Sequence, residues 1–377
     1  MDITTDPIGP RELPHAHRPS RSAGRSRRGM STVLLAGVAL TGMVGCGSSD
    51  AAPAAAATLA LTTSAAPTPT PTPPSPPPTW PLTGLESGDA GDRPALAVKI
   101  ENSVDARPQT GLGAADMVWE EVVEGGITRY VAVYHSTIPP EIGPVRSIRP
   151  MDPGIAAPLR GLFAFSGGQR VFVDAVGKAG LQVVSNDAGA SGFHRIKARS
   201  APHNVYADAQ ALLDQADAGH QAPPGPQFDI AASGEQPTAV IAGTPSGSVQ
   251  LTLSGVSHPT WSWSPADGRW LRAEGTKPAV EADGTPLRAT NVVVLRTETV
   301  DSGKIDPAGN PVPETVMVGS GEALVATGGS TVPATWAKSA VGERLVLRGQ
   351  DGNPIELAAG NTWVELVPAA TGTVTVG

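Results

Sequence analysis

The proline-rich segment at residues 67–79 places the strongest constraint on what this chain can fold into. Its sequence is PTPTPTPPSPPPT, and the chain from Gly47 to this segment consists mainly of Ala, Thr, Ser, Pro and Gly. Such a composition favours the extended polyproline II conformation and lacks the apolar periodicity needed to bury a core. We therefore predict a disordered spacer over residues 46–79, able to reach up to roughly 100 Å, with the folded body beginning at Trp80.

The segment before the spacer has the features of an export signal. Residues 21–30 are rich in arginine, and residues 31–45 form an uncharged apolar run that is shorter than the roughly 20 residues of a membrane-spanning helix. Cys46, the only cysteine, follows this run directly. The pattern resembles the bacterial lipoprotein signal, which implies a signal peptide over residues 1–45, diacylglycerol on Cys46 and an extracytoplasmic body held at the cell membrane by lipid. A plain secretory peptide is the alternative.

Charge and cysteine content exclude several classes of function. The net charge is −8, but six of the 27 basic residues and only three of the 35 acidic residues precede Cys46, so the remainder carries −11. A body this acidic lacks the basic face that nucleic-acid binding requires. One cysteine permits neither an internal disulfide nor a multi-cysteine zinc site. We expect no metal and no cofactor.

The first half of the body, residues 80–222, predicts a mixed α/β domain. Strand-like runs occupy 94–102, 116–124 and 127–135, and the last two are separated only by Gly125-Gly126. Two glycines between alternating runs are a strong hairpin signal, because both can adopt positive φ angles. Helical spacing over 170–180 and 207–219, each ending at glycine, predicts two helices.

The second half, residues 225–377, predicts a β-rich antiparallel domain, which makes the whole body α+β. Short β-prone runs recur there, separated by turn signals such as Asp267-Gly268 and Gly328-Gly329. Tryptophans at 261, 263, 270, 336 and 363 fall on these runs. They could form an aromatic platform for sugars, but the scarcity of other aromatic residues favours a role in the core.

Arginines in the first half are the leading candidates for a binding site. Their planar guanidinium groups suit carboxylate or phosphate groups. Structural ion pairs with Glu120, Glu124 or Asp116 are the competing interpretation. The candidate ligand-binding residues are Arg107, Glu120, Glu124, Arg129, Arg146, Arg149, His203 and Asn204.

Hydrolysis is a second hypothesis. Glu120 and Glu124 are four residues apart on a predicted strand, so we expect them on one face and Glu121 on the other. His203 could pair with Ser147. The sequence contains no GxSxG, HExxH or phosphate-loop motif, and no catalytic residue can be assigned.

Four segments carry a resemblance to a known family. RPALAVKIEN, ARPQTGLGAADMVWEEVVEGGITRYVAVY, IGPVRSIR and RSAPHNVY resemble, in order and spacing, the YerB-like bacterial lipoproteins, whose domain has no assigned activity. The resemblance covers about residues 80–370 and implies a lipoprotein with an α/β N-terminal part and a β-rich C-terminal part. We expect non-catalytic binding or organisation of a cell-envelope component, either an anionic cell-wall glycan or an envelope protein. The alternatives are an envelope hydrolase acting on glycan or phosphate esters, and a structural scaffold.

Overall fold

The computed structural model describes residues 77–88 and 91–377. The predicted signal peptide over 1–45, the lipid attachment at Cys46 and nearly all of the predicted spacer therefore lie outside the described residues. Within the described part, no helix combines the length and the apolar character needed to cross a bilayer.

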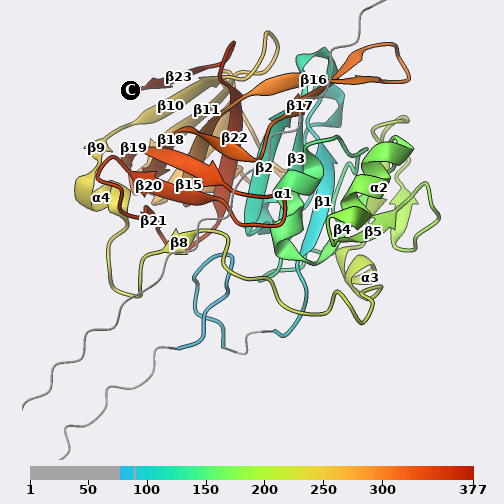
Figure 1. The fold of residues 1–377 in the computed structure, drawn as a ribbon, viewed down its shortest axis with the longest axis horizontal. Coiled ribbons are helices and arrows are strands. Elements are labelled where there is room, and N and C mark those ends of the chain that lie inside the picture. The colour runs from blue at the N-terminus through green and yellow to red at the C-terminus, as the bar shows by residue number, and fades with distance from the viewer. Residues whose placement is uncertain (1–76, 89–90) are drawn as a thin grey trace, which may run out of the picture. The chain divides into compact units, whose positions relative to one another are not determined.

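A large mixed sheet contains strands from both halves of the body (Figure 1). Its strands are β1 (Leu96–Glu101), β2 (Met117–Val122), β3 (Thr128–Tyr134), β4 (Leu162–Phe165), β5 (Gln182–Ser185), β9 (Thr244–Pro245), β15 (Asn291–Thr297), β18 (Gly319–Thr327), β19 (Ser330–Lys338), β20 (Val346–Gly349) and β22 (Thr362–Pro368). The order is β20-β19-β18-β15-β22-β2-β3-β1-β4-β5, and β9 pairs with β19. The halves join where β2 runs parallel to β22, with Met117 beside Thr362. The domain boundary at residues 222–225 stays a prediction.

The predicted glycine hairpin lies near the centre of this sheet. β2 and β3 pair antiparallel, and Val122 faces Thr128 at the closed end. Gly125 and Gly126 have φ angles of 69° and 75°, values that residues other than glycine rarely adopt. The hairpin prediction is confirmed, although β2 ends at Val122, two residues before Glu124.

A second, smaller sheet belongs to the C-terminal half. Its six strands are β10 (Ser248–Thr252), β11 (Pro259–Ser264), β12 (Arg269–Glu274), β13 (Lys277–Pro278), β14 (Arg288–Ala289) and β23 (Thr373–Val376). All its pairs are antiparallel, and Trp263 of β11 faces Trp270 of β12. The predicted α+β fold with an antiparallel β-rich C-terminal part is confirmed, although β22 is parallel to both of its neighbours.

Three two-stranded sheets complete the β-structure of residues 77–88 and 91–377. They pair β6 (Phe193–Arg195) with β7 (Val205–Ala207), β8 (Asp229–Ile230) with β21 (Glu356–Leu357), and β16 (Thr299–Ile305) with β17 (Pro311–Thr315). The β16–β17 hairpin reaches the N-terminal half, where Gln169 Nε2 donates to the Ile305 carbonyl at 3.0 Å.

Helices are few and short. The α-helices are α1 (Asp152–Ala156), α2 (Arg170–Lys178), α3 (Ala209–Leu213) and α4 (Thr238–Ala242), and 3-10 turns span Val104–Ala106, Leu112–Ala114, Glu124–Gly126 and Ala157–Leu159. The helix predicted over 170–180 is confirmed as α2. The one predicted over 207–219 is only α3, which begins after Asp208, whose carboxylate caps the Ala211 N–H at 2.9 Å.

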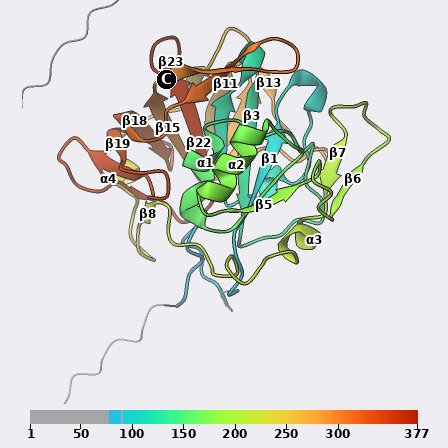
Figure 2. The same ribbon diagram turned by 45° about the vertical axis from the view of Figure 1, so that its right-hand side comes forward.

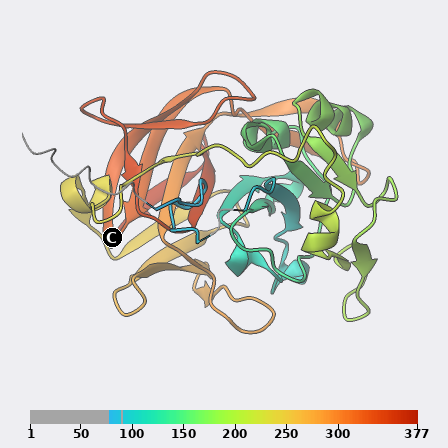
Figure 3. The same cartoon turned by 90° about the horizontal axis from the view of Figure 1, so that it is seen from below.

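The core consists of two clusters of buried side chains. Trp119 and Val131 cluster with Ile155 of α1 and Phe172 of α2, whereas Tyr130 clusters with residues of the second sheet such as Trp261. Because neighbouring residues of a strand point to opposite faces, the clusters lie on opposite faces of the large sheet. Figures 2 and 3 show α1 and α2 on one side, and Figure 3 shows the second sheet on the other.

The tryptophans belong mainly to this core. Trp261, Trp270, Trp336 and Trp363 are at most 3% exposed, and Trp263 is half-buried. The preference for a core role over a sugar-binding platform is confirmed for the four buried rings.

Candidate functional site

Three of the loops that resemble the family meet beside the end of β1. Isolated β-bridges join Ile100 to Val145, Thr110 to Gly143, and Ile142 to Ala207. Arg199 adds to this contact, because its guanidinium donates to the carbonyls of Asp105 at 2.5 Å and Pro108 at 2.6 Å. The polar segments around residues 102–109, 142–149 and 199–204 therefore form one region.

Strand alternation divides the charged side chains between the two faces of the sheet. Arg129 of β3 lies directly opposite Glu101 of β1 and Glu121 of β2, and directly opposed residues share a face. Glu120, opposite Tyr130, points to the other face. The prediction that Glu120 and Glu121 face opposite sides is confirmed.

On the face of the sheet that carries Arg129, three arginines gather around two carboxylates. We call this group, together with His203, the arginine cluster. Its members are Glu101, Glu124, Arg129, Arg146, Arg149 and His203. Three guanidinium groups against two carboxylates give the cluster one net positive charge when His203 is neutral. Three of the four arginines predicted to converge therefore do so, and Arg107 does not.

Arg129 is the arginine of the cluster that makes no ion pair with a described carboxylate. Its side chain donates from Nη1 to the Ser147 carbonyl at 2.6 Å, but its buried Nε makes no hydrogen bond to the described residues. Burial, with the nearby charges of Arg149 and Arg146, lowers the pKa of Arg129 to about 9. Arg129 is only 4% exposed, so its charge is buried without an ion pair to any described carboxylate, although Glu101 and Glu124 lie near enough to act on its pKa.

The other two arginines each have a carboxylate partner. Arg149 Nε lies 2.5 Å from Glu124 Oε1. Arg146 Nε lies 3.3 Å from Glu101 Oε1, and His203 Nδ1 lies 2.9 Å from the other oxygen of Glu101. The side chains of Arg146 and His203 are 24% and 23% exposed, so solvent reaches the arginine cluster beside Glu101.

The expectation that Glu120 and Glu124 share a strand face is wrong. Glu124 belongs to the 3-10 turn after β2, where it pairs with Arg149. Glu120 lies on β2 and pairs with Arg272 on the opposite face of the sheet. The strand ends two residues earlier than the sequence pattern predicts, because the chain enters the turn before Gly125.

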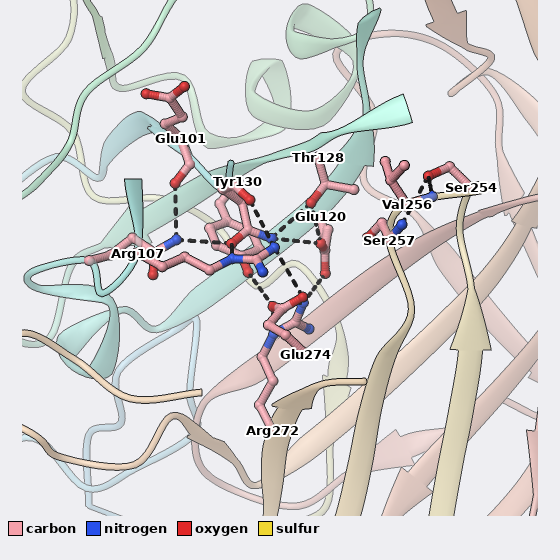
Figure 4. A network of polar contacts seen from close by, with 12 residues as sticks. Glu101, Arg107, Glu120, Thr128, Tyr130, Ser254, Val256, Ser257, Arg272 and Glu274 are labelled. Atoms are coloured by element: carbon pink, nitrogen blue, oxygen red, sulfur yellow. Dashed lines mark hydrogen bonds and ion pairs between the residues drawn. The ribbon is translucent and has the colours of Figure 1, made fainter. Parts of the chain in front are cut away.

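The second face holds a buried ion network that the sequence analysis missed. Arg272 of β12 lies 2.6 Å from Glu120, 2.8 Å from Glu365 and 2.9 Å from Glu274. Its guanidinium carbon also lies 5.1–5.6 Å from the ring centres of Tyr130, Trp261 and Trp363. We call Arg272 with its three glutamates the Arg272 network; it links the two halves of the body (Figure 4).

Charges in the Arg272 network are not equivalent. Burial acts to raise the pKa of Glu120, but the Arg272 charge together with hydrogen bonds to Glu365, Thr128 and Arg272 outweighs burial, and the net shift is downward. Burial, with the Glu120 charge, raises the pKa of Glu365 well above its usual value. The network therefore favours the ionised form of Glu120 and the protonated form of Glu365.

Arg107 borders the Arg272 network. Its Nη2 lies 3.1 Å from Glu274 Oε2, and its Nε donates to Asn102 at 2.8 Å. Figure 4 shows both guanidinium groups, of Arg107 and Arg272, beside Glu274. Arg107 thus makes a structural ion pair, but with Glu274 rather than with Glu120, Glu124 or Asp116, the partners considered from the sequence.

The serine and histidine candidates are not paired with each other in the described structure. Ser147 Oγ lies 3.3 Å from Ser166 Oγ, whereas His203 contacts Glu101. Asn204 accepts from Arg195 at 2.6 Å, away from the arginine cluster. Among residues 77–88 and 91–377, no group of three or more His, Cys, Asp or Glu side chains is placed to hold a metal ion.

A sequence signal could have identified Arg272. In the strand-forming run RWLRAE, Trp270, Arg272 and Glu274 alternate with other residues and share a face. A tryptophan on that face indicates that it is buried. An arginine there must then have buried partners.

Comparisons with known proteins agree with the resemblance found in the sequence. The chain matches the model described as "Protein of unknown function (DUF3048) N-terminal domain" over residues 82–222 and the corresponding C-terminal domain over residues 249–364. "Putative lipoprotein YerB" of Bacillus subtilis (strain 168) is 47% identical over 70 residues, which are 18% of this chain and 21% of that protein. The aligned segment thus spans about a fifth of the relative's length.

A solved structure supports the fold. The crystal structure of the YerB protein from Bacillus subtilis matches with a TM-score of 0.66 at 21% identity and covers 79% of this chain and 99% of that chain. At this level of identity the likeness concerns the fold alone. With both of the family's domains matched in order, the chain belongs to the DUF3048 family of YerB-like proteins.

Proposed function

We propose that this protein is a lipid-anchored extracytoplasmic protein whose body binds an anionic group of a cell-wall polymer at the arginine cluster, without catalysis. The observation that carries the proposal is Arg129, a buried guanidinium whose Nε has no hydrogen-bond partner among the described residues. Phosphate and carboxylate groups are the ligands that guanidinium forks bind best.

The anchor is supported by the N-terminal sequence and by a relative. An apolar run followed directly by the single Cys46 resembles the lipoprotein signal, and the similar Bacillus subtilis protein is named a putative lipoprotein. A lipid on Cys46 would hold the acidic body at the outer face of the membrane, within reach of the cell wall.

The charge balance supports anion binding. Within the arginine cluster, three guanidinium groups stand against two carboxylates. An added anion would therefore complement Arg129, whose pKa is lowered by burial and by the charges of Arg149 and Arg146. Arg146 and His203 are partly exposed beside the buried arginine. A ligand could therefore approach along Arg146 and displace water from the cluster.

The carboxylates considered for hydrolysis are less suited to that role. Glu120 is fully buried and its pKa is lowered in the Arg272 network, whereas a general acid needs a raised pKa and access to substrate. Glu124 is held by Arg149. These contacts favour binding over catalysis.

Sedimentation of the full-length protein with lipid-free, insoluble cell wall tests the proposal. Arg146→Ala should lower the retained fraction at least about fivefold, because a charge-assisted hydrogen bond contributes roughly 1.5–3 kcal/mol. Inorganic phosphate should compete with the wall for the wild-type protein.

Arg170→Ala provides the matched control. This arginine is 88% exposed on α2 and pairs with Asp174, outside the arginine cluster. Its removal lowers the net charge equally and should leave retention unchanged. Equal retention of wild type, Arg146→Ala and Arg170→Ala would remove the arginine cluster as the binding site.

A further inference from the structure

Beneath the arginine cluster lies a second charged group that the proposed function does not use. Lys99 of β1, Glu121 of β2 and Asp152 of α1 are all 0% exposed. Lys99 Nζ lies 2.7 Å from Asp152 Oδ1 and also contacts Glu121 Oε1. We call these three residues the lysine triad.

The triad has too many carboxylates for its single amine. Two ionised carboxylates and one ammonium group would leave a net negative charge at a fully buried site, at a high cost in free energy. Burial, with the Asp152 charge, raises the pKa of Glu121 to about 8. Glu121 therefore holds a proton at neutral pH, and the triad combines an ammonium group, a carboxylate and a carboxylic acid.

This combination is suited to forming an amide bond. The amine is already at contact distance from the Asp152 carboxyl group, which supplies the proximity that such a reaction requires. Asp152 Oδ2 accepts the backbone N–H of Arg149 at 2.6 Å. That donor would stabilise the negative charge that develops on the carboxyl oxygen during attack.

We propose that the Lys99 amine and the Asp152 side chain join in an intramolecular amide bond, which the folded chain forms by itself with Glu121 as proton carrier. The Lys99 ammonium group first passes a proton to Asp152 Oδ1, and the neutral nitrogen attacks Cγ of Asp152. A C–N bond forms, the bond from Cγ to Oδ1 breaks, and Glu121 protonates the departing oxygen. The amine's second proton returns to Glu121, so one amide and one water result.

The product relieves the unfavourable feature of the triad. A buried ion pair becomes a neutral amide, and the released water leaves a site shielded from solvent, which disfavours the reverse hydrolysis. The cross-link would close a loop between two residues 53 positions apart. It would also fix the loop of the arginine cluster, because the Arg146 N–H donates to the Lys99 carbonyl at 2.8 Å and the Arg149 N–H to Asp152.

A covalent bond of this kind would serve a body that cannot form a disulfide. The chain has one cysteine, so no internal disulfide is available to a protein that we place outside the membrane. An amide would supply the same restriction of the unfolded chain without redox chemistry.

Mass spectrometry of a proteolytic digest, made after full denaturation of the full-length protein, tests the inference. We expect one branched fragment that joins the peptide of Lys99 to the peptide of Asp152, lighter than their sum by one water molecule. An ion pair does not survive denaturation. Separate, unmodified peptides from the wild-type protein would overturn the inference, as would a branch at Glu121.

Two variants separate the chemistry from the fold. Glu121→Gln keeps the shape of the side chain but cannot carry the proton, and should yield mostly unlinked peptides. Glu101→Gln changes the carboxylate two positions from Lys99 on the same strand and should remain fully linked. Full cross-linking in Glu121→Gln would contradict the role of Glu121, and the wild-type digest decides the bond itself even where a variant fails to fold.

Discussion

Arg272 and Glu120 form a fully buried ion pair, 2.6 Å between Nη2 and Oε2, that joins the second sheet to the central hairpin of the large sheet. The partners are 152 residues apart in the chain. Glu365, from the strand beside β2, contacts the same guanidinium. The two halves of the body therefore share one ionic centre as well as one sheet, and we expect them to unfold together.

Replacing Arg272 should destabilise the whole body. Arg272→Met leaves Glu120 buried beside Glu365 without a cation, and removing one partner of a buried pair typically costs about 3–5 kcal/mol. Urea denaturation followed by tryptophan fluorescence measures this loss, and we expect a single transition. Arg269→Met, at a half-buried position of the same strand, should change the free energy of unfolding by less than about 1 kcal/mol. A similar loss in both variants would show that the Arg272 network contributes little.

Local patterns explain why part of this fold could be predicted. The β2–β3 hairpin depends on two adjacent glycines and on strands that are neighbours in sequence, and α2 depends on spacing within a few turns. By contrast, nothing local indicates that β22 enters the sheet between β15 and β2. The pairing of β22 with β2 joins residues more than 200 positions apart in the chain.

For the candidate site, the sequence indicates which residue types take part but not how they are placed in space. Arg129, Arg146 and Arg149 were recognised by residue type, and they converge because bridges from Ile100 to Val145 and from Ile142 to Ala207 align distant loops. Arg107 has the same chemistry but contacts Glu274 on the other face. Arg107 directly follows the 3-10 turn at Val104–Ala106, and no local pattern in the sequence indicates which face of the sheet this loop approaches.

His135 should make stability depend on pH. Burial, which outweighs its hydrogen bond to the Arg93 carbonyl, lowers the pKa of His135 to about 4. In the unfolded chain His135 becomes protonated below about pH 6.5. In the folded chain it becomes protonated only near pH 4. Stability is therefore present above pH 6.5 and falls as the pH drops, by at most about 1.4 kcal/mol per pH unit.

Denaturation curves of wild type and His135→Gln between pH 4 and pH 7.5 check this prediction. The difference in stability between the two proteins should shrink toward acid pH. His258→Gln, at an exposed position, serves as the control and should run parallel to wild type. Parallel curves for His135→Gln would mean that His135 does not resist protonation in the fold.

Removing a carboxylate from the arginine cluster should strengthen anion binding. Glu101 partly neutralises Arg146 and contacts His203, and one charge within about 10 Å of a bound anion is worth roughly 1–2 kcal/mol at an effective dielectric constant of about 20. Glu101→Gln should therefore raise affinity for lipid-free cell wall about tenfold. Glu141→Gln, exposed and paired with His194, should change it little. Weaker binding by Glu101→Gln than by Glu141→Gln would contradict an electrostatic site.

Gly143 should be required for the loop that carries the arginines. Its Cβ, if present, would lie 2.5 Å from Cδ1 of Tyr206, and both residues are buried where Thr110 and Ala207 bridge the loop. Gly143→Ala must displace the ring or the loop, and overpacking of this kind costs about 1–3 kcal/mol. Gly255→Ala, with no atom within 4 Å of the added carbon, is the control. Thermal denaturation of both variants measures the difference in stability. Arg146 follows Gly143 by three residues, so a displaced loop should also move this arginine. Gly143→Ala should therefore lower retention on cell wall at a temperature where the variant remains folded. Unchanged stability and retention would show that the Tyr206 contact does not position the arginines.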